Sequence, residues 1–279
     1  MDAPADLDFS DKTVLVTGGT KGIGAVIASR FLAAGANVVV CGRQAPERLP
    51  EGSGRVAEFI AVDVRDLDSL VALFAAIDER YGRLDVLINN AGGSPAAEAA
   101  TASPRFHEGI IRLNLIAPLN VAQQANRLMQ RDGGGVILFI GSVAALRPSP
   151  GTAAYGAAKA GVLALVSSLA VEWAPKVRVA AISPGLIRTE QSHLHYGDEA
   201  GIQAVGRTIP GGRMGEPDDI ANACLFAASP MATYFSGTNL LLHGGGEKPA
   251  FLDAANAEQH CCNPGDAAGG GVQTDPSGG

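Results

Sequence analysis

GSVAALRPSPGTAAYGAAK, residues 141–159, brings three polar side chains, Ser142, Tyr155 and Lys159, into one short stretch of the chain. Tyr155 and Lys159 stand four positions apart in an Ala-rich run, and this spacing places both side chains on one face of a helix. An ammonium group beside a phenol favours the phenolate, so it lowers the pKa of the phenol from about 10 toward neutrality. The stretch therefore predicts a proton donor and acceptor near the start of a helix.

Ser142 extends this hypothesis, because it ends the apolar run GVILFIGS, which is typical of a buried strand. The loop over residues 143–153 can return the chain so that the Ser142 hydroxyl lies beside the Tyr155 phenol. A hydroxyl in that position would hold a carbonyl oxygen against Tyr155. Taken alone, a Tyr–Lys pair on a helix is more often ordinary surface, so the rest of the chain decides between the two interpretations.

The composition indicates an acidic protein with a large core. The 279 residues are 47% hydrophobic, the net charge is −7 and the pI is about 5.2. This charge argues against nucleic acid or an anionic membrane as a partner, because both bind basic surfaces. The first twelve residues lack the apolar core of a signal peptide, and Ser167 and Ser168 interrupt the apolar residues 160–171, so we expect a buried helix and no membrane span.

The four cysteines, Cys41, Cys224, Cys261 and Cys262, are too few and too unevenly placed for a disulfide framework. We therefore expect reduced thiols and a cytoplasmic location.

A glycine turn follows the first predicted strand. Residues 12–17, KTVLVT, are β-branched and lack alternation, as expected for a strand buried on both faces of a parallel sheet. Gly18, Gly22 and Gly24 come next and lead into an amphipathic helix that ends near Gly35. Strand, glycine turn and helix together predict a phosphate cradle, since the helix N-terminus offers free N–H groups; an ordinary tight turn is the alternative.

The end of the next strand bears on which dinucleotide is bound. The strand over residues 37–41 runs into Gly42 and Arg43, with no acidic residue at the position that would bind a ribose 2′-hydroxyl. Arg43 and Lys21 can instead bind a 2′-phosphate through charge-assisted hydrogen bonds, or both can be solvated surface residues. The pattern therefore favours NADP(H), with NAD(H) possible.

The remaining elements alternate between strands and helices, which predicts an α/β fold with one doubly wound, Rossmann-type parallel sheet of about seven strands flanked by helices. The further strands are expected over residues 56–62, 84–88, 135–142, 177–182 and 237–243. The further helices are expected over 67–81, with Ser69 or Asp66 as its cap, 105–131 and 214–228. Small and polar residues follow several strand ends, where a ligand crosses the sheet. They are Asp63 and Val64, Asn90, Ala91 and Gly92, and Pro184 and Gly185.

Residues 190–212 are polar, contain Gly and lack a regular pattern, so we expect an irregular lid over the substrate. His193 and His195 lie in this segment without a third ligand nearby, and we expect no metal site. The expected domain spans residues 11–248, with an N-terminal extension over 1–10 and a C-terminal extension over 249–279. The last twenty residues are rich in Gly, Ala, Pro and Asp, which predicts disorder, and we expect no metal role for His260, Cys261 and Cys262.

Six motifs stand in order along residues 10–246, and with them the chain resembles the short-chain dehydrogenase/reductase family. The similarity is to the single-domain branch that includes β-oxoacyl carrier-protein reductases and hydroxysteroid dehydrogenases. The motifs are TGGTKGIG at 17–24, NNAG at 89–92 with Asn114, Ser142, YGAAK at 155–159, PGLIRT at 184–189 and GRMGEPDDIA at 212–221.

The resemblance implies a role for each of four catalytic residues. Tyr155 would be the general acid or base at the substrate oxygen, and Lys159 would lower its pKa and hold the nicotinamide ribose. Ser142 would polarise the carbonyl, and Asn114 would bind a water that connects Lys159 to solvent. The cofactor-binding residues expected from the strand ends and the resemblance are Gly18, Lys21, Gly22, Ile23, Gly24, Arg43, Asp63, Val64, Asn90, Ala91, Gly92, Tyr155, Lys159, Pro184, Gly185, Ile187 and Thr189.

We therefore expect an NADP(H)-dependent oxidoreductase that interconverts a carbonyl and a secondary alcohol on a small or hydrophobic substrate. A β-oxoacyl thioester reductase of lipid metabolism is the first alternative, and a non-catalytic dinucleotide-sensing protein is an alternative from another class. The resemblance also implies a homotetramer, or a dimer, assembled through the helices that hold Asn114 and Tyr155.

Overall fold

The computed structural model describes residues 7–254. The chain divides into two compact units between Gly246 and Glu247, two residues before the boundary expected from the sequence. The second unit contributes one described helix, α9 (Ala250–Ala254). The expectations for the last twenty residues, and for His260, Cys261 and Cys262, concern residues outside the described part of the chain.

Seven strands form one parallel sheet in the order β5-β2-β1-β6-β7-β8-β9, which confirms the expected fold class. The register pairs Thr17 with Cys41 and Ile140 with Ile182, so the carboxyl ends of the strands meet at one edge. The strands are β1 (Thr13–Thr17), β2 (Asn37–Gly42), β5 (Glu58–Ala61), β6 (Val86–Asn89), β7 (Gly135–Ile140), β8 (Val177–Pro184) and β9 (Asn239–Leu242).

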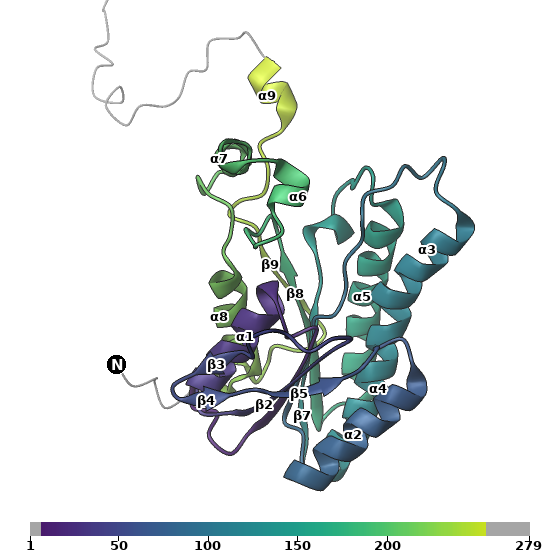
Figure 1. Ribbon diagram of the computed structural model, residues 1–279, viewed down its shortest axis with the longest axis vertical. Coiled ribbons are helices and arrows are strands. Elements are labelled where there is room, and N and C mark those ends of the chain that lie inside the picture. The colour runs from purple at the N-terminus through teal and green to yellow at the C-terminus, as the bar shows by residue number, and fades with distance from the viewer. Residues whose placement is uncertain (1–6, 255–279) are drawn as a thin grey trace, which may run out of the picture. The chain divides into compact units, whose positions relative to one another are not determined.

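Helices cover both faces of this sheet (Figure 1). On one face α1 and α8 bury Ile27, Phe31 and Ile220 completely, and on the other α2, α4 and α5 bury side chains such as Phe74 and Val121. Two apolar layers therefore enclose the sheet, as its continuous apolar strands predict. The helices are α1 (Gly22–Ala33), α2 (Leu67–Tyr81), α4 (Ala117–Arg131), α5 (Ala153–Glu172) and α8 (Pro217–Ala228).

Local capping explains why α2 has the predicted bounds. The Asp66 carboxylate accepts hydrogen bonds from the N–H groups of Asp68 and Ser69 at 2.9 and 3.2 Å, so Asp66, and not Ser69, is the cap. Gly82 ends the helix with a φ of 66°, a left-handed conformation that suits glycine. Both ends of α2 therefore follow from residues adjacent in sequence.

The helical region expected over residues 105–131 changes its winding in the middle. It begins as α3 (Pro104–Ile111) behind the capping side chain of Ser103 and ends as α4. Between them Arg112–Ile116 form a π-helical segment, whose end bonds the Ala117 N–H to the Arg112 carbonyl. Such π-helical turns are rare and concentrate at functional sites, and this one contains the buried Asn114.

The strand expected over residues 56–62 forms as β5, but it is shorter, because Val56 belongs to a hairpin that was not predicted. This antiparallel hairpin consists of β3 (Glu51–Gly52) and β4 (Arg55–Val56). Ser53 and Gly54 connect the hairpin with φ angles of 48° and 75°. Positive φ at both central residues is the signature of a two-residue hairpin turn, and this turn chemistry decided the local structure.

The lid segment is also more regular than expected, since it contains α6 (His193–Tyr196) and α7 (Glu199–Thr208). Asp198 caps α7 by accepting the Gly201 N–H at 3.0 Å. The glycines of this segment suggested a loop, but this cap is sufficient to start a helix among them.

By length and composition alone, α5 is apolar enough to cross a membrane. In the fold its buried side chains, including Val162, Val166 and Leu169, lie in the apolar layer on the sheet, and Ala164, Ser167 and Ser168 face outward. The core helix of a globular domain passes the same test.

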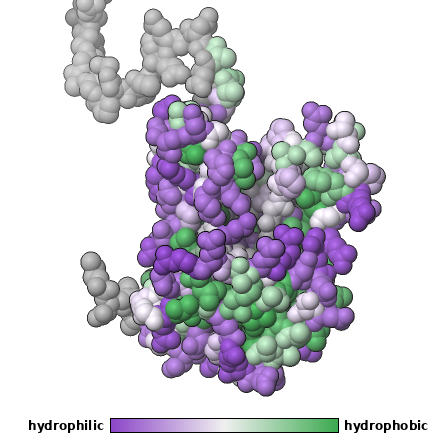
Figure 2. Space-filling model, in the orientation of Figure 1, coloured by the Kyte–Doolittle hydropathy of each residue, from purple (hydrophilic) through white to green (hydrophobic). Residues whose placement is uncertain are grey.

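On the surface, hydrophobic residues lie among hydrophilic ones over β5 and α2 (Figure 2), where Leu67 and Val71 are exposed.

Candidate active site

The carboxyl edge of the sheet gathers the residues expected at the site. Gly18 follows β1, Arg43 follows β2, Asp63 follows β5, Asn90 follows β6 and Ser142 follows β7. In a parallel sheet these positions share one edge, and the strand order reverses between β1 and β6, which is where ligands bind in such sheets. Figure 2 shows a hollow on this face of the domain, between the α6–α7 segment and the part that leads into α3.

Ser142, Tyr155 and Lys159 come together as the sequence predicts. Ser142 follows β7, its hydroxyl accepts the Ala144 N–H at 3.1 Å, and it lies close enough to Tyr155 to lower the pKa of the phenol. The Lys159 ammonium lies 5.6 Å from the centre of the Tyr155 ring, one helical turn along α5. It donates to the Ile140 carbonyl at 2.7 Å, so the end of β7 holds both the lysine and the serine near the phenol.

The pKa values in this cluster differ from the expectation. Burial raises the pKa of Tyr155, and the hydrogen bond from Ser142 opposes that rise. Burial also lowers the pKa of Lys159 to about 8, because the ammonium is only 4% exposed. The lysine therefore carries its charge at pH 7, but desolvation of the phenol outweighs its influence on Tyr155.

Asn114 is held by the backbone around it. Its amide nitrogen donates to the carbonyls of Ile110 and Gly93, both at 2.9 Å, and its amide oxygen accepts the Gly93 N–H at 2.8 Å. The side chain is fully buried and uses its main donors and acceptor in these bonds, so it fixes the loop after Asn90–Gly92. The amide nitrogen therefore has no donor left for a water, and the amide oxygen keeps one acceptor position.

The NNAG loop lies directly against Lys159. A methyl group placed on Gly92 would lie 2.7 Å from the Asn114 amide oxygen and 3.5 Å from the Lys159 ammonium. Only glycine allows the loop to approach this closely. The loop, the π-helical segment and α5 therefore meet at one point beside the catalytic cluster.

The glycine turn between β1 and α1 packs against the same loop. Gly18 has a φ of 62°, and the Asn90 amide donates to the carbonyls of Thr17 and Gly18 at 2.9 and 3.1 Å. A methyl group on Gly24 would collide with the Gly18 carbonyl and the Asn90 amide, so the turn can close only around glycine. By contrast, a methyl group on Gly22 would meet only side-chain atoms, the nearest of them 3.7 Å away, so no backbone closes this side of the turn.

Arg43 and Lys21 are both exposed, and neither side chain forms a hydrogen bond or ion pair within residues 7–254. Arg43 lies close enough to Asp63 to lower the pKa of its carboxyl group. The main cause of that low pKa, about 2, is Arg65, which donates to Asp63 at 2.6 and 2.9 Å. Because Arg65 neutralises Asp63, a phosphate beside Arg43 would meet little repulsion from this carboxylate.

The end of β8 forms the opposite wall. The Gly185 N–H donates to the Leu242 carbonyl at 2.7 Å, directly after Pro184 at the end of β8. Ile187 forms a backbone bridge with Gly215, and the Thr189 N–H donates to the Ser192 hydroxyl at 2.9 Å. Ile23 in α1 is half-buried, and Val64 after β5 is buried. The expected cofactor residues thus surround one strand edge.

Comparison with known proteins identifies the family and the fold. The family model described as enoyl-(acyl carrier protein) reductase matches residues 18–247. A 3alpha-hydroxysteroid dehydrogenase from Mediterraneibacter gnavus is 37% identical over 249 residues, which cover 85% of this chain and 97% of that protein. The chain belongs to the short-chain dehydrogenase/reductase family.

Other members of the short-chain dehydrogenase/reductase family show the range of relatives. A 3-oxoacyl-[acyl-carrier-protein] reductase from Chlamydia trachomatis is 36% identical over 242 residues, covering 84% of this chain and 97% of that protein. A solved structure of a 7 alpha-hydroxysteroid dehydrogenase, complexed with NADH and 7-oxo glycochenodeoxycholic acid, superposes with a TM-score of 0.79. It is 30% identical and covers 88% of this chain and 99% of its own.

Membership of the short-chain dehydrogenase/reductase family makes the protein an oxidoreductase that acts on hydroxyl or carbonyl groups with NAD(P)(H). It favours an enzyme over the non-catalytic dinucleotide-sensing alternative. No group of three or more His, Cys, Asp or Glu side chains suitable for a metal occurs within the part of the chain that the structure describes.

Sequence reasoning missed two residues that hold this short-chain dehydrogenase/reductase site together. The Thr17 hydroxyl accepts the N–H groups of Asn90 and Ala91, both at 3.0 Å, and so joins β1 to the NNAG loop. The Asn89 amide donates to the Pro118 carbonyl at 2.7 Å and joins β6 to α4. Both residues stand at strand ends within or beside the motifs, and their polarity at a buried position was the available signal.

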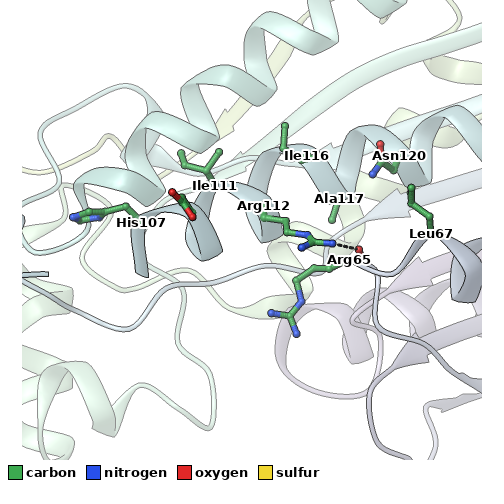
Figure 3. Close-up of a pocket in the computed structure, with 9 residues that line it drawn as sticks. Arg65, Leu67, His107, Ile111, Arg112, Ile116, Ala117 and Asn120 are labelled. Atoms are coloured by element: carbon green, nitrogen blue, oxygen red, sulfur yellow. Dashed lines mark hydrogen bonds between the residues drawn. The ribbon is translucent and has the colours of Figure 1, made fainter. Parts of the chain in front are cut away.

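A cavity of about 660 Å³ lies apart from the catalytic cluster, along α3, the π-helical segment and the start of α4 (Figure 3). The Arg112 guanidinium donates to the Arg65 carbonyl at 3.1 Å in its wall. None of the expected catalytic or cofactor residues lines this cavity, so it is not the active site. Its lining residues are Arg65, Leu67, His107, Glu108, Ile111, Arg112, Ile116, Ala117 and Asn120.

Proposed function

We propose that this enzyme is an NADP(H)-dependent oxidoreductase that interconverts a carbonyl and a secondary alcohol on a small or hydrophobic substrate, with Tyr155 as general acid and base. The observation that carries the proposal is the cluster of Ser142, Tyr155 and Lys159 beside the glycine turn. Leu146 and Leu194, near the site in sequence, are 52% and 67% exposed, which supports an apolar substrate.

The residues of the cluster divide the reaction between them. The bound dinucleotide supplies a hydride to the carbonyl carbon, or accepts it in reverse. The Ser142 hydroxyl donates to the substrate oxygen and stabilises the negative charge that develops there. Tyr155 transfers its phenolic proton to that oxygen in the reducing direction and takes it back in the oxidising direction.

Lys159 and the helix that carries Asn114 return the proton to Tyr155. The buried ammonium stabilises the phenolate and would also hold the nicotinamide ribose. Pro118 stands four residues after Asn114 and lacks the N–H that would bond to the Asn114 main-chain carbonyl in an α-helix. We place the relaying water on that carbonyl, because the Asn114 side chain is committed to the Gly93 and Ile110 backbone.

A titration tests this function directly. Purified protein would be titrated with NADPH and NADH in parallel, following nicotinamide fluorescence, and then assayed with a panel of ketones. Tighter binding of NADPH and ketone reduction are the expected results. Tighter binding of NADH would contradict the cofactor preference, and binding of neither would contradict the function as a whole.

Replacing Arg43 by Asp is expected to change the NADPH/NADH preference by about tenfold to a hundredfold in favour of NADH. The reason is that a hydrogen bond to a charged group contributes about 1.5–3 kcal/mol, and an Asp here can bind the ribose 2′-hydroxyl. The measurement is the ratio of the two kcat/KM values. Arg55→Asp, which makes the same change on the exposed β4, is the control, and an unchanged ratio for Arg43→Asp would remove Arg43 from phosphate binding.

The rate of carbonyl reduction is expected to fall above about pH 8. Lys159 is protonated below its pKa of about 8, and only the ammonium form stabilises the phenolate that Tyr155 becomes. The kcat/KM at saturating cofactor should therefore be level below this pH and decline about tenfold per pH unit above it. A level profile up to about pH 9.5 would contradict this role of Lys159.

A β-oxoacyl thioester reductase is the second candidate, favoured by the 36% identity to a 3-oxoacyl-[acyl-carrier-protein] reductase. A competition between acetoacetyl-CoA and free hydrophobic ketones separates the two candidates. A kcat/KM that is higher for the thioester would replace the first proposal by the second.

Assembly and location are part of the proposal. The apolar wall of the α3–α4 cavity, with Ile116 44% exposed, supports a homotetramer or dimer assembled through this helix. We place the enzyme in the cytoplasm, in keeping with the buried free thiols of Cys41 and Cys224. A monomer in light scattering would contradict the assembly.

A further inference from the structure

Glu190 stands on a segment that the backbone holds firmly beside the glycine turn. The Arg188 N–H donates to the Gly215 carbonyl at 2.8 Å, and the Gly215 N–H donates to the Leu186 carbonyl at 2.9 Å. On the other side the Glu190 carbonyl bonds to the ring of His193 at 2.9 Å. These bonds fix the main chain on both sides of Glu190.

That position is over the start of α1. A methyl group placed on Gly22 would lie 3.7 and 3.9 Å from the two carboxylate oxygens of Glu190, closer than to any other group. Gly22 has a φ of 54° and is the first residue of α1. The carboxylate therefore lies beside the glycine turn, on the side toward which a side chain at position 22 would point.

Electrostatics explains why the carboxylate lies there. The N-terminus of a helix attracts negative charge, and the first turn of α1 carries no acidic residue of its own. The Glu190 carboxylate makes no hydrogen bond or ion pair with other residues between 7 and 254. The start of α1 is thus its nearest favourable electrostatic partner.

The pyrophosphate of a dinucleotide would bind beside this carboxylate, because the free N–H groups at the start of a helix favour an anion there. We propose that Glu190 is an affinity-determining residue whose carboxylate competes with the cofactor pyrophosphate for the glycine turn. The inference rests on the proposed dinucleotide-dependent function. Cofactor binding must displace an anion that belongs to the protein, and this weakens the observed affinity.

The segment that carries Glu190 is also joined to the lid. Two residues before it, the Arg188 guanidinium donates to the Glu199 carboxylate at 2.8 Å, and Glu199 is the first residue of α7. This exposed ion pair connects the 188–190 segment to α7.

The test is the affinity of Glu190→Gln for ADP-ribose, NADH and NADPH, with adenosine as a probe that lacks phosphate. Gln keeps the shape and removes the charge, and we expect all three anionic ligands to bind about threefold to tenfold more tightly. Adenosine binding should not change, and the gain should shrink as salt rises. Glu172→Gln, an exposed carboxylate at the end of α5, controls for net charge.

Each outcome is decisive. If Glu190→Gln and the unchanged protein bind ADP-ribose with equal affinity, the inference is overturned and the proposed function is left intact. The same holds if Glu172→Gln gains as much affinity for ADP-ribose as Glu190→Gln. Weaker binding by Glu190→Gln would overturn it by showing that the carboxylate supports the complex. Failure of both proteins to bind any dinucleotide would overturn the inference and the proposed function together.

Discussion

Replacing Tyr155 by Phe is expected to lower kcat by about a hundredfold to ten-thousandfold while the dissociation constant of the cofactor stays nearly unchanged. General acid catalysis by a positioned side chain contributes this range, and Phe removes only the phenolic oxygen. The ring is partly buried in α5, so the variant keeps the packing and loses only the phenolic hydroxyl, which lies near Ser142. The measurement combines steady-state kinetics with a fluorescence titration of NADPH.

Tyr234→Phe is the matched control for this experiment. Tyr234 is fully exposed, so the same loss of a hydroxyl there should leave kcat unchanged. Activity of Tyr155→Phe within tenfold of the unchanged enzyme would contradict Tyr155 as the acid. A large rise in the dissociation constant would indicate that the phenol mainly binds cofactor.

Replacing Lys159 by Met is expected to abolish most of the activity and to stabilise the fold. Lys159 is 4% exposed, and burial depresses its pKa from 10.5 to about 8. That depression of the pKa means that the charged, buried ammonium lowers the free energy of unfolding by about 3 kcal/mol at neutral pH. Met fills a similar volume without a charge, at the loss of the hydrogen bond to Ile140, so a net gain of about 1–2 kcal/mol should remain.

The pH dependence gives this prediction a second readout. In the unfolded protein Lys159 keeps its proton up to a higher pH than in the folded protein. The destabilisation by the buried charge is therefore fully present below about pH 8 and disappears between about pH 8 and pH 10.5. The difference in free energy of unfolding between Lys159→Met and the unchanged protein should therefore shrink across this range. Lys176→Met removes an exposed lysine that also donates to a carbonyl, and it should show neither effect.

A destabilised Lys159→Met variant would contradict the electrostatic cost, and activity within tenfold would contradict a role for the ammonium in catalysis. The combined expectation, less activity with more stability, is the pattern of a residue kept for function.

Much of the fold was predictable because the signals are local. The apolar strand of residues 13–17, the glycine turn and the Asp66 cap of α2 are each specified by neighbouring residues. The spacing of Tyr155 and Lys159 likewise placed both side chains on one helical face. Where a local signal was overlooked, as with Ser53 and Gly54, the structure contains a hairpin that was not predicted.

The candidate site was predictable in its members but not in its electrostatics. The sequence suggested that Lys159 lowers the pKa of Tyr155, whereas burial raises it. Desolvation depends on how much protein surrounds a group, and that is a sum over segments distant in sequence. The pairing of Asp63 with Arg65, only two residues away, was also not foreseen, because side-chain direction at a strand end depends on the fold.

By itself, the sequence determined the alternation of strands and helices, the position of the glycine turn and the identity of the polar groups at the carboxyl edge of the sheet, because periodicity and turn chemistry act over a few residues. Only the tertiary structure decided that Asn114 lies in a π-helical turn and holds Gly93, and that Glu190 lies over Gly22. These contacts join residues 21 and 168 positions apart. They arise when the whole sheet packs and buried polar groups must find partners, and no local pattern encodes that choice.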